Sequence, residues 1–455
     1  MADPNVIVVG AGPAGVRTAE RLVRAGLRPI IVDEASTAGG QIYRRQPPNF
    51  KRTAKELYGF EAARAEALHL AFDALKPAID HRPETLAWSV FGGRINLASP
   101  AGTSSLPFDA LILATGATDR IFPVPGWTLP GVASLGGAQI ALKAQACVIG
   151  RKPVFLGTGP LLYLVACQYA KAGVRTAMVL DTSRLSARFQ ALSKLASRPA
   201  MLAKGVHYSA RLVASGIPVL TGVTPLAIEG KERVGGVRFR DARGRKRQVT
   251  CDSVGLGFGL RSETQLADLA GCGFVFDPVA SQWLPEIDRD GRSSVRHVYL
   301  AGDGARIAGA EAAEIAGKLA ACALLADFGR HVPPGEFEEH RSALARMGRF
   351  SEGLERAFPW PSRLARDYPD EALVCRCEAV TAGELRRSVE ALGAIELNRA
   401  KAFSRVGMGR CQGRYCGLAG AEIMAAALDV RLAQVGRLRG QAPVKPLPVA
   451  VKRVG

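Results

Sequence analysis

The alternation of apolar and polar positions near the N-terminus predicts a strand, a turn, a helix and a second strand. NVIVV (5–9) is almost wholly apolar, which is typical of a strand buried on both faces. PAGVRTAERLVRAG (13–26) then spaces its apolar residues three and four apart, as an amphipathic helix does. A second apolar run, PIIV (29–32), follows. This order predicts one βαβ unit with parallel strands.

The same pattern recurs between residues 152 and 181, in KPVFLGTGPLLYLVACQYAKAGVRTAMVLD. Two further apolar runs, FDALILATGA (108–117) and HVYLAGDGARIAGAEAAEIAGKLAA (297–321), enclose this repeat. The arrangement predicts a second domain inserted into the first. We therefore expect an α/β fold with two Rossmann-like three-layer dinucleotide-binding domains, followed by a small helical C-terminal domain.

These segments give the expected domain limits. The first domain is discontinuous (1–134 and 286–330), and the inserted domain covers 135–285. A stretch rich in Arg, Pro and Glu, 331–371, is interpreted as a helical linker. The C-terminal domain is expected at 372–440, and the proline-containing end (441–455) is interpreted as an extended arm that binds a partner.

Glycines punctuate the first turn in the order G-x-G-x-x-G, at Gly10, Gly12 and Gly15. In such a turn the first glycine permits a tight bend, and the second lets a pyrophosphate approach the backbone. The third lets the helix pack close to the sheet. The phosphates then sit on the helix N-terminus, here at Pro13 and Ala14. The turn therefore predicts a dinucleotide site.

The end of the second strand supplies an acid in both repeats. Asp33 and Glu34 stand where a carboxylate accepts ribose hydroxyls, and Asp181 is the equivalent acid of the second repeat. There Leu162 replaces the third glycine and brings a large side chain to the helix–strand contact. The retained glycines are Gly157 and Gly159. We expect either a weakened ATP or NAD(P) site or an unused nucleotide fold.

Composition and charge restrict the setting of the protein. The formal charge is +19, and basic residues crowd at 184–211, 231–247 and 341–366. We interpret this charge as favouring solubility and an acidic partner subunit, with attachment to the inner face of the cytoplasmic membrane as an alternative. Nucleic-acid binding is not expected, because no basic helix or aromatic platform of a known reader is present. No apolar run is long enough to span a bilayer, so we expect a cytoplasmic protein without a signal peptide.

Four of the nine cysteines form a spaced set near the C-terminus. VCRCE and GRCQGRYCG supply C-x-C and, thirty-three residues on, C-x-x-x-x-C. A disulfide, a zinc ion and a [2Fe–2S] cluster are the competing interpretations. Arginine side chains and glycine N–H groups beside the ligands would balance thiolate charge, which favours the cluster. The four candidate ligands are Cys375, Cys377, Cys411 and Cys416, and the neighbouring arginines are Arg376, Arg410 and Arg414.

These motifs together resemble the two-dinucleotide-binding-domain flavoproteins over almost the whole chain. The resemblance implies that the first glycine motif and the acid after it hold the adenosine half of FAD. It also implies that three further segments line the flavin and its ribityl–pyrophosphate linker, and that an acid in the last of them bonds the linker. Those segments are Gly39-Gly40-Gln41, Thr115-Gly116 and Gly302-Asp303.

Two segments narrow the resemblance. FPVPGWTLPGVASLGGAQIALK (122–143) and GTGPLLYLVA (157–166) look like the α (A) subunits of bacterial amine and imino-acid dehydrogenases. That family includes opine oxidases, D-hydroxyproline and L-proline dehydrogenases and hydrogen cyanide synthase. The C-terminal cysteines look like the bacterioferritin-associated-ferredoxin type of [2Fe–2S] domain, so the resemblance favours the cluster over zinc.

The resemblance implies a division of labour between subunits. A D-amino-acid-oxidase-like β subunit oxidises a small amine or imino acid, such as an opine, D-hydroxyproline or proline. Some members have a small ferredoxin-like γ subunit, or an FMN at the subunit interface. Electrons then pass through the α subunit to a quinone or another carrier. Because the six histidines are scattered, the sequence assigns no catalytic residue to this chain.

Two other functions remain open at this point. The chain could be a self-sufficient NAD(P)H-dependent FAD/[2Fe–2S] reductase, or a non-catalytic scaffold that binds nucleotides for assembly. A disulfide reductase is not expected, because the remaining five cysteines stand singly in apolar surroundings.

Overall fold

A computed structural model describes residues 3–448 of the chain. The first sheet has five parallel strands in the order β20-β7-β1-β2-β3. In register, Val8 lies opposite Ile31 on one side and Ile112 on the other. Apolar segments that lie far apart in the sequence therefore form neighbouring strands of one sheet. The strands are β1 (Val6–Val9), β2 (Ile30–Val32), β3 (Asp80–Arg82), β7 (Ala110–Leu113) and β20 (Val298–Leu300).

Alternation along β1 determines which layer covers each face of this sheet. Val6 and Val8 pack in a core with the helices α1, α3 and α10, whereas Ile7 and Val9 pack in a core with β4 and β5. Successive strand residues point to opposite faces, so a fully apolar β1 is buried on both. The covering elements are α1 (Pro13–Arg24), α3 (Ala62–Leu75), α10 (Ala310–Asp327), β4 (Leu86–Phe91), β5 (Arg94–Ser99) and β6 (Gly102–Pro107).

The second sheet repeats this three-layer design. It has five parallel strands in the order β12-β11-β10-β16-β9, with helices on one face and an antiparallel three-stranded sheet on the other. Its strands are β9 (Val132–Ser134), β10 (Pro153–Thr158), β11 (Met178–Asp181), β12 (Val219–Thr221) and β16 (Ser253–Phe258). Its covering elements are α4 (Leu135–Ala144), α5 (Pro160–Lys171), α8 (Pro199–Ala214), β13 (Thr224–Gly230), β14 (Val234–Arg240) and β15 (Lys246–Thr250). The expected α/β architecture is confirmed.

The chain crosses between the two domains through an antiparallel pair, β8 (Ala117–Asp119) with β17 (Leu260–Ser262). Strand β9 already belongs to the second sheet, so this domain begins before the expected residue 135. It also ends before the expected residue 285, because Leu266 and Ala267 of α9 (Gln265–Leu269) pack in the core of the first domain. The hairpin β18 (Phe274–Asp277) and β19 (Gln282–Pro285) follows α9. Both crossing strands are short and polar, so no apolar pattern marks the boundary in the sequence.

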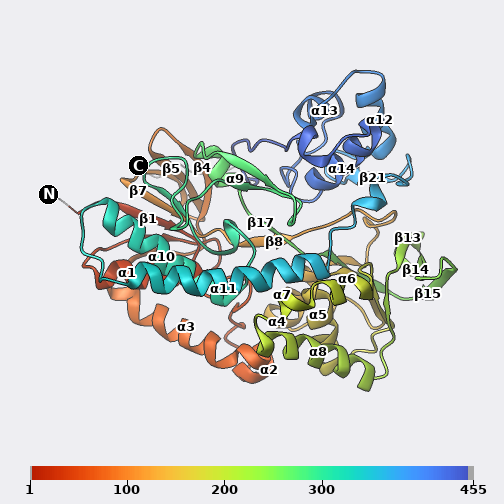
Figure 1. Cartoon of the computed structure of the whole chain (residues 1–455), viewed down its shortest axis with the longest axis horizontal. Helices are drawn as coiled ribbons and strands as arrows, with labels where there is room; N and C mark the ends of the chain where they lie inside the picture. The colour runs from red at the N-terminus through yellow and green to blue at the C-terminus, as the bar shows by residue number, and fades with distance from the viewer. Residues whose placement is uncertain (1–2, 449–455) are drawn as a thin grey trace.

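Helix α11 (Glu336–Ala357) runs across the molecule and joins both domains (Figure 1). It packs on α10 at one end and on the short helices α6 (Leu185–Gln190) and α7 (Leu192–Leu195) at the other. The stretch expected as a helical linker is thus largely this one helix. No helix among residues 3–448 is long and apolar enough to cross a membrane.

The C-terminal unit lies over the second domain and the crossing strands (Figure 1). Trp127 donates its indole N–H to the carbonyl of Leu373 at 2.8 Å, and Phe122 packs edge-on against Tyr368. Thr381 and Glu384 form the predicted capping box at the start of α12. The elements are β21 (Leu373–Cys375), β22 (Val380–Thr381), α12 (Ala382–Glu390), α13 (Leu397–Ser404) and α14 (Gly417–Leu428). Helix α2 (Ala54–Tyr58) and five 3-10 turns, Gly59–Glu61, Lys76–Ala78, Gly302–Gly304, Ser362–Ala365 and Leu432–Val435, complete the fold.

Candidate cofactor sites

The glycines at and near the first turn are of two kinds. Some are required because neighbouring atoms leave no room for a side chain, and others face open space. A Cβ on Gly10 would lie 2.3 Å from the carbonyl oxygen of Ala114, and one on Gly15 would lie 1.8 Å from that of Gly10. A Cβ on Gly12 would meet only the Cα of Gly40, at 3.6 Å. Gly10 and Gly15 are therefore required by packing. Gly12 and Gly40 instead bring two backbones together with no side chain between them.

The N-terminus of α1 is open to an anion. Its N-cap is Gly12, so no side chain accepts from the first N–H groups of the helix, and Pro13 occupies the first turn. Unsatisfied N–H groups and the helix dipole make such an end suited to a phosphate. Asp303 faces the same region from the turn before α10, where its carboxylate accepts from the N–H groups of Ala308 (2.8 Å) and Gly309 (3.0 Å). Burial raises the pKa of Asp303.

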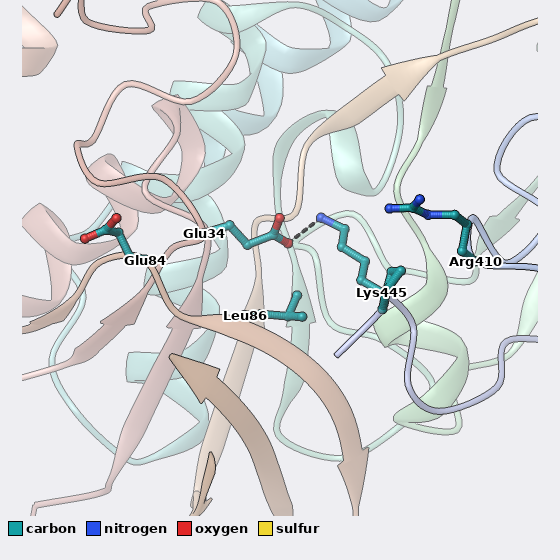
Figure 2. Close-up of a pocket in the computed structure, with 6 residues that line it drawn as sticks. Glu34, Glu84, Leu86, Arg410 and Lys445 are labelled. Atoms are coloured by element: carbon teal, nitrogen blue, oxygen red, sulfur yellow. Dashed lines mark hydrogen bonds and ion pairs between the residues drawn. The ribbon is translucent and has the colours of Figure 1, made fainter. Parts of the chain in front are cut away.

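The two acids after β2 have different tasks. Asp33 accepts from the backbone N–H groups of Ala11 and Ala35, so it fixes the glycine turn from behind. Burial raises its pKa, against the lowering effect of these bonds. Glu34 is half exposed and faces outward, where it forms an ion pair with Lys445 (Figure 2). Both carboxylates line the cavity, Asp33 bound by backbone N–H groups and Glu34 by a lysine side chain.

A cavity of about 1260 Å³ connects these groups. It runs from Glu34 past the glycine turn and on between the two domains, where α4, α5, α8 and α11 contribute its walls. An open helix N-terminus, a side-chain-free cradle and a terminal carboxylate in this order fit an extended dinucleotide. The predicted residues that line it are Gly10, Gly12, Pro13, Ala14, Asp33, Glu34, Gly40, Gln41, Thr115, Gly116 and Asp303. Gly15 and Gly302 lie behind the wall, where Gly302 lets Ala14 approach the α10 turn.

The second glycine motif is closed by the chain's own side chains. Asp181 is fully buried and accepts from the Tyr163 hydroxyl at 2.7 Å, the Ser183 N–H at 2.8 Å and the Arg188 guanidinium. Tyr163 follows the replaced third glycine, and Arg188 also stacks on its ring. The acid expected to meet a ribose is thus already saturated. Gly157 and Gly159 do not line the cavity, and a Cβ on Gly157 would meet the carbonyl oxygen of Gly257 at 1.6 Å.

The four C-terminal cysteines come together and are unpaired thiols. Hydrogen bonding to Cys416 lowers the pKa of Cys375 to about 6 and that of Cys411 to about 5. The same contacts raise the pKa of Cys416, and burial raises that of Cys377, which contacts Cys411. Cys416 caps α14, whose positive dipole end faces the thiols.

A [2Fe–2S] cluster takes two thiolates on each of its two irons. The four converging thiols supply that number of ligands.

The arginines predicted to balance the thiolates are divided among other tasks. Arg376 stacks between Trp127 and Tyr415, with its guanidinium 5.4 and 4.8 Å from the ring centroids. Arg414 is committed to Glu263. Lys401 was not predicted; it is buried, burial lowers its pKa, and the nearby Cys416 opposes that shift only in part. Its place on α13 gave no sequence signal.

Three contacts tie the cysteine loop to the first domain. Arg414 forms a bidentate pair with Glu263 (2.7 and 3.2 Å), and Gln265 donates to the carbonyl of Gln412 at 2.6 Å. Glu263 in turn accepts, through its carbonyl, the hydroxyl of Thr115 at 2.6 Å. The wall of the dinucleotide cavity therefore touches the cysteine loop directly. Sequence reasoning missed Glu263, because it stands alone between β17 and α9 without a motif.

The segment 440–446, called here the C-terminal strap, covers the Glu34 end of the cavity. Val444 is buried, donates to the carbonyl of Trp88 at 3.0 Å and accepts from Arg414 at 2.6 Å. Lys445 then reaches Glu34, and Arg410 faces the same small pocket of about 340 Å³ (Figure 2). The described part of the expected partner-binding arm thus packs on its own chain. The rest of that arm, from residue 449, lies outside the described residues.

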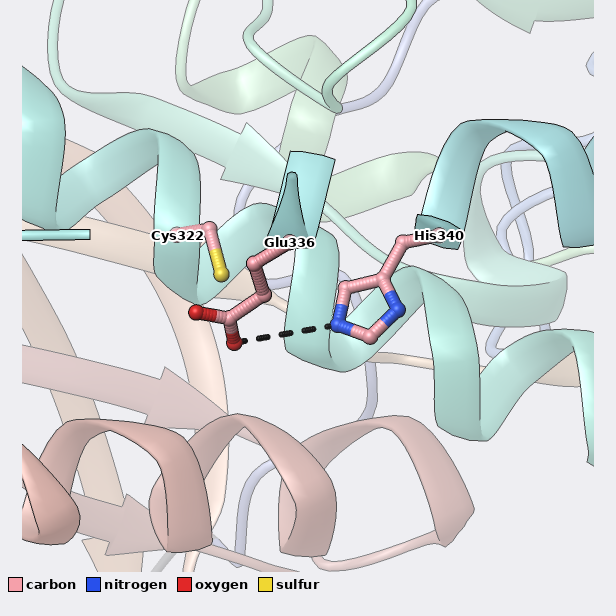
Figure 3. Close-up of side chains that lie close together, drawn as sticks. All are labelled: Cys322, Glu336 and His340. Carbon is pink, nitrogen blue, oxygen red and sulfur yellow. Dashed lines mark ion pairs between the residues drawn. The ribbon is translucent and has the colours of Figure 1, made fainter. Parts of the chain in front are cut away.

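A third group of potential ligands joins α10 to α11. The ligand atoms of Cys322, Glu336 and His340 lie within 4.8 Å of one another (Figure 3). Arg21 already binds both oxygens of Glu336, at 2.7 and 3.0 Å, which neutralises the carboxylate. Burial raises the pKa of Cys322 to about 12. We assign this group to the packing of α11 on α10.

The cradle and the four thiols define an FAD-dependent oxidoreductase that carries a [2Fe–2S] domain. Residues 4–318 match the pyridine nucleotide-disulphide oxidoreductase family, and residues 373–426 match the BFD-like [2Fe-2S] binding domain. The chain belongs to this oxidoreductase family, in the group that contains the A subunits of opine oxidases. The predicted family and the predicted FAD and [2Fe–2S] cofactors are thereby confirmed.

Relatives match over nearly the whole chain. The A subunit of opine oxidase from Rhizobium meliloti is 38% identical over 463 residues, 98% of this chain and 86% of the relative. The HcnB subunit of hydrogen cyanide synthase from Pseudomonas aeruginosa is 32% identical over 456 residues, 97% of each chain. The solved structure of L-proline dehydrogenase from P. horikoshii has the same fold, with a TM-score of 0.70 over 98% of this chain and 78% of that one, at 19% identity.

Proposed function

We propose that this chain is the electron-transferring α subunit of a heteromeric dehydrogenase. In this proposal a β subunit of the D-amino-acid-oxidase type oxidises a small amine or imino acid, such as an opine, D-hydroxyproline or proline. The observation that carries the proposal is the direct contact between the dinucleotide cavity and the cysteine loop through Glu263 and Arg414. The relatives are named as single subunits of opine oxidase and of hydrogen cyanide synthase, which supports a complex of several chains.

The two cofactors supply complementary electron chemistry when bound, because FAD accepts electron pairs and a [2Fe–2S] centre carries single electrons. The chain's own residues hold them in place. The N–H groups at the start of α1 receive the phosphates, and Glu34 receives the ribose. Cys375, Cys377, Cys411 and Cys416 hold the irons.

The closed second motif supports a partner, not a nicotinamide, as the source of electrons. Tyr163 and Arg188 saturate Asp181, so the second domain offers no free acid for the ribose of NAD(P). A reductase of the self-sufficient kind would need that acid. We propose that electrons enter from the β subunit, then leave through the cluster to a quinone or another carrier.

We propose two further components of the complex from the family resemblance. They are an FMN at the subunit interface and a small ferredoxin-like γ subunit. The expected ATP or NAD(P) in the second domain is not proposed, because Tyr163 and Arg188 already occupy Asp181. Peripheral attachment to the cytoplasmic membrane is a further proposal, supported by the basic surface.

Anaerobic co-purification from the native host tests the function. We expect a second flavoprotein subunit, FAD and two irons per α chain, and amine-dependent reduction of the whole complex. Reduction of the isolated chain by millimolar NADH or NADPH would instead establish the stand-alone reductase. A third outcome, electron flow that persists after Gly12→Trp empties the FAD site, would establish a scaffold.

A further inference from the structure

The side chain of Leu438 packs into the cysteine loop (407–417), against three of its glycines. A Cβ on Gly407 or Gly413 would overlap the Cδ1 atom of Leu438, and one on Gly417 would lie 3.2 Å from that atom. Gly407 and Gly413 are also neighbours in space, because a Cβ on Gly407 would lie 3.6 Å from the Cα of Gly413. One leucine side chain therefore supports separate parts of the loop at once.

Two of these glycines have a backbone conformation that a side chain would strain. The φ angle is +79° at Gly407 and +76° at Gly413, in the left-handed region that favours glycine. A glycine backbone is the least restricted of all, because no side chain limits it or packs around it. Leu438 supplies from outside the packing that these two residues lack.

The same two glycines provide backbone hydrogen bonds to cluster ligands. Cys416 first, and then the backbone of Gly407, lower the pKa of Cys375. Cys416 first, and then backbone groups that include Gly413, lower the pKa of Cys411. Hydrogen bonds of this kind favour the thiolate, which is the form that binds iron. The leucine therefore lies against backbone that donates to two of the four thiols.

The residues on both sides of Leu438 are anchored independently of its side chain. Arg437 forms a bidentate pair with Asp268 of α9, at 2.6 and 2.8 Å. Asn398 of α13 donates to the carbonyl of Arg437 and accepts from the N–H of Arg439, both at 2.9 Å. The backbone is thus held to the first domain and to the C-terminal unit alike. Shortening the leucine side chain should leave these anchors in place.

We propose that Leu438 is a positioning residue of the iron–sulfur centre. Its side chain holds the backbones of Gly407 and Gly413 so that their N–H groups face the cluster sulfurs. One electron added to a [2Fe–2S] cluster gives it one further negative charge, with no bond formed or broken. N–H donors aimed at the sulfurs stabilise that charge and so raise the reduction potential. The inference rests on the [2Fe–2S] cofactor and not on the identity of the partner or the substrate.

The test measures the midpoint potential of the cluster in the full-length protein, by anaerobic redox titration followed with electron paramagnetic resonance. Leu438→Ala should weaken the preference for the reduced form at least threefold, which lowers a one-electron potential by about 30 mV. Leu438→Met keeps the size of the side chain and should stay within threefold of the native protein. Leu432→Ala is the matched control and should also stay within threefold. Leu432 packs on the same core, but Leu438 supplies the side-chain atoms nearest to the three glycines.

Amide hydrogen exchange of residues 405–414, measured on the same samples, reports on the glycine N–H groups directly. Exchange there should be at least threefold faster in Leu438→Ala than in the native protein, and native-like in Leu432→Ala. A lowered potential with unchanged exchange overturns the inference, because the effect would then not pass through the glycine backbones. An equal fall in potential in Leu432→Ala overturns it as well.

Iron content separates the remaining outcomes. Iron-loaded Leu438→Ala with a potential within threefold of native, or above it, overturns this inference alone and leaves the proposed function standing. A native protein that holds no [2Fe–2S] cluster after anaerobic purification overturns both this inference and the cluster assignment. If Leu438→Ala does not retain iron, Leu438→Val, which shortens the side chain by one carbon, is judged by the same threefold threshold.

Discussion

Glu263 and Arg414 form a buried ion pair that joins the flavin-lining wall to the cysteine loop. The Arg414 Nε lies 2.7 Å from a Glu263 oxygen, and the Arg414 and Glu263 side chains are 10% and 9% exposed, respectively. Burial opposes ionisation of Glu263, but Arg414 and Arg261 outweigh it and lower the pKa of Glu263. One guanidinium thus connects the cavity wall, the carbonyl of Cys411 and the C-terminal strap.

Breaking this pair should loosen the C-terminal unit. Glu263→Gln leaves Arg414 buried without its counter-charge, which costs about 3–5 kcal/mol in comparable pairs. We expect a lower urea midpoint, faster proteolysis of residues 372–440 and loss of iron. Glu263→Leu with Arg414→Met removes both charges and should recover part of the loss. Equal stability of the native protein and Glu263→Gln would contradict the role given to the pair.

The four thiols should be required for iron, whereas other cysteines should not. Cys411→Ser or Cys416→Ser is expected to abolish iron and the visible absorbance beyond the flavin bands, with FAD content kept above half. Cys147→Ser, at an exposed site, is the control and should change neither. Elemental analysis of protein kept anaerobic makes the measurement. Zinc in place of iron would refute the cluster.

The first glycine turn should give two distinct phenotypes. Gly15→Ala places a Cβ 1.8 Å from the Gly10 carbonyl oxygen and should destabilise the fold by about 2–3 kcal/mol. Gly12→Ala meets only the Cα of Gly40 at 3.6 Å, and its backbone suits any residue. Its methyl group enters the phosphate cradle, so we expect near-native thermal stability but at least tenfold weaker FAD binding. Equal effects of the two changes would count against the cradle.

Asp181 should matter for stability and not for nicotinamide binding. Asp181→Asn removes the charge that Arg188 and Tyr163 share, and should cost about 2–4 kcal/mol in thermal or urea unfolding. Calorimetric titration with NADH or NADPH should show no binding to either protein. If the native protein binds NADH or NADPH and Asp181→Asn does not, the second domain holds a nicotinamide site after all.

Glu355 should make the fold less stable as the pH rises. Burial first, then Asp277, raise its pKa from 4.5 to about 7, while Arg306 and Arg120 oppose the shift. The folded state therefore keeps the proton longer than the unfolded chain does, so stability falls between about pH 4.5 and pH 7. Glu355→Gln should exceed the native protein by about 1 kcal/mol above pH 7 and match it near pH 4. Chemical denaturation at both pH values measures the difference, and a constant offset would contradict it.

Sequence periodicity predicted most of the fold because the central strands of both sheets, such as β1, β7 and β10, are buried and largely apolar. The run that includes Val6 and Ile7 reads as a strand at once, and glycines after it mark the cradle. The domain crossing was placed wrongly, because β8 and β17 are short and polar and have no partner within their own neighbourhood of sequence.

The candidate site was less predictable where residues act through long-range contacts. Asp33 and Glu34 looked equivalent, yet backbone N–H groups bind the first, and the Lys445 side chain binds the second. Tyr163 closes the second motif only because Asp181 and Arg188 meet it in space.

The C-terminal strap is the last segment to be synthesised of all those that line the cavity. Translation produces residues 440–446 after every other part of the FAD site, from Gly10 to Asp303. While those residues are still inside the ribosome, the Glu34 end of the cavity has no cover. We therefore expect cofactor entry to be fastest on the nascent chain and to slow after release, when Lys445 reaches Glu34. The order of synthesis would then favour cofactor entry during the time before the strap covers the Glu34 end of the cavity.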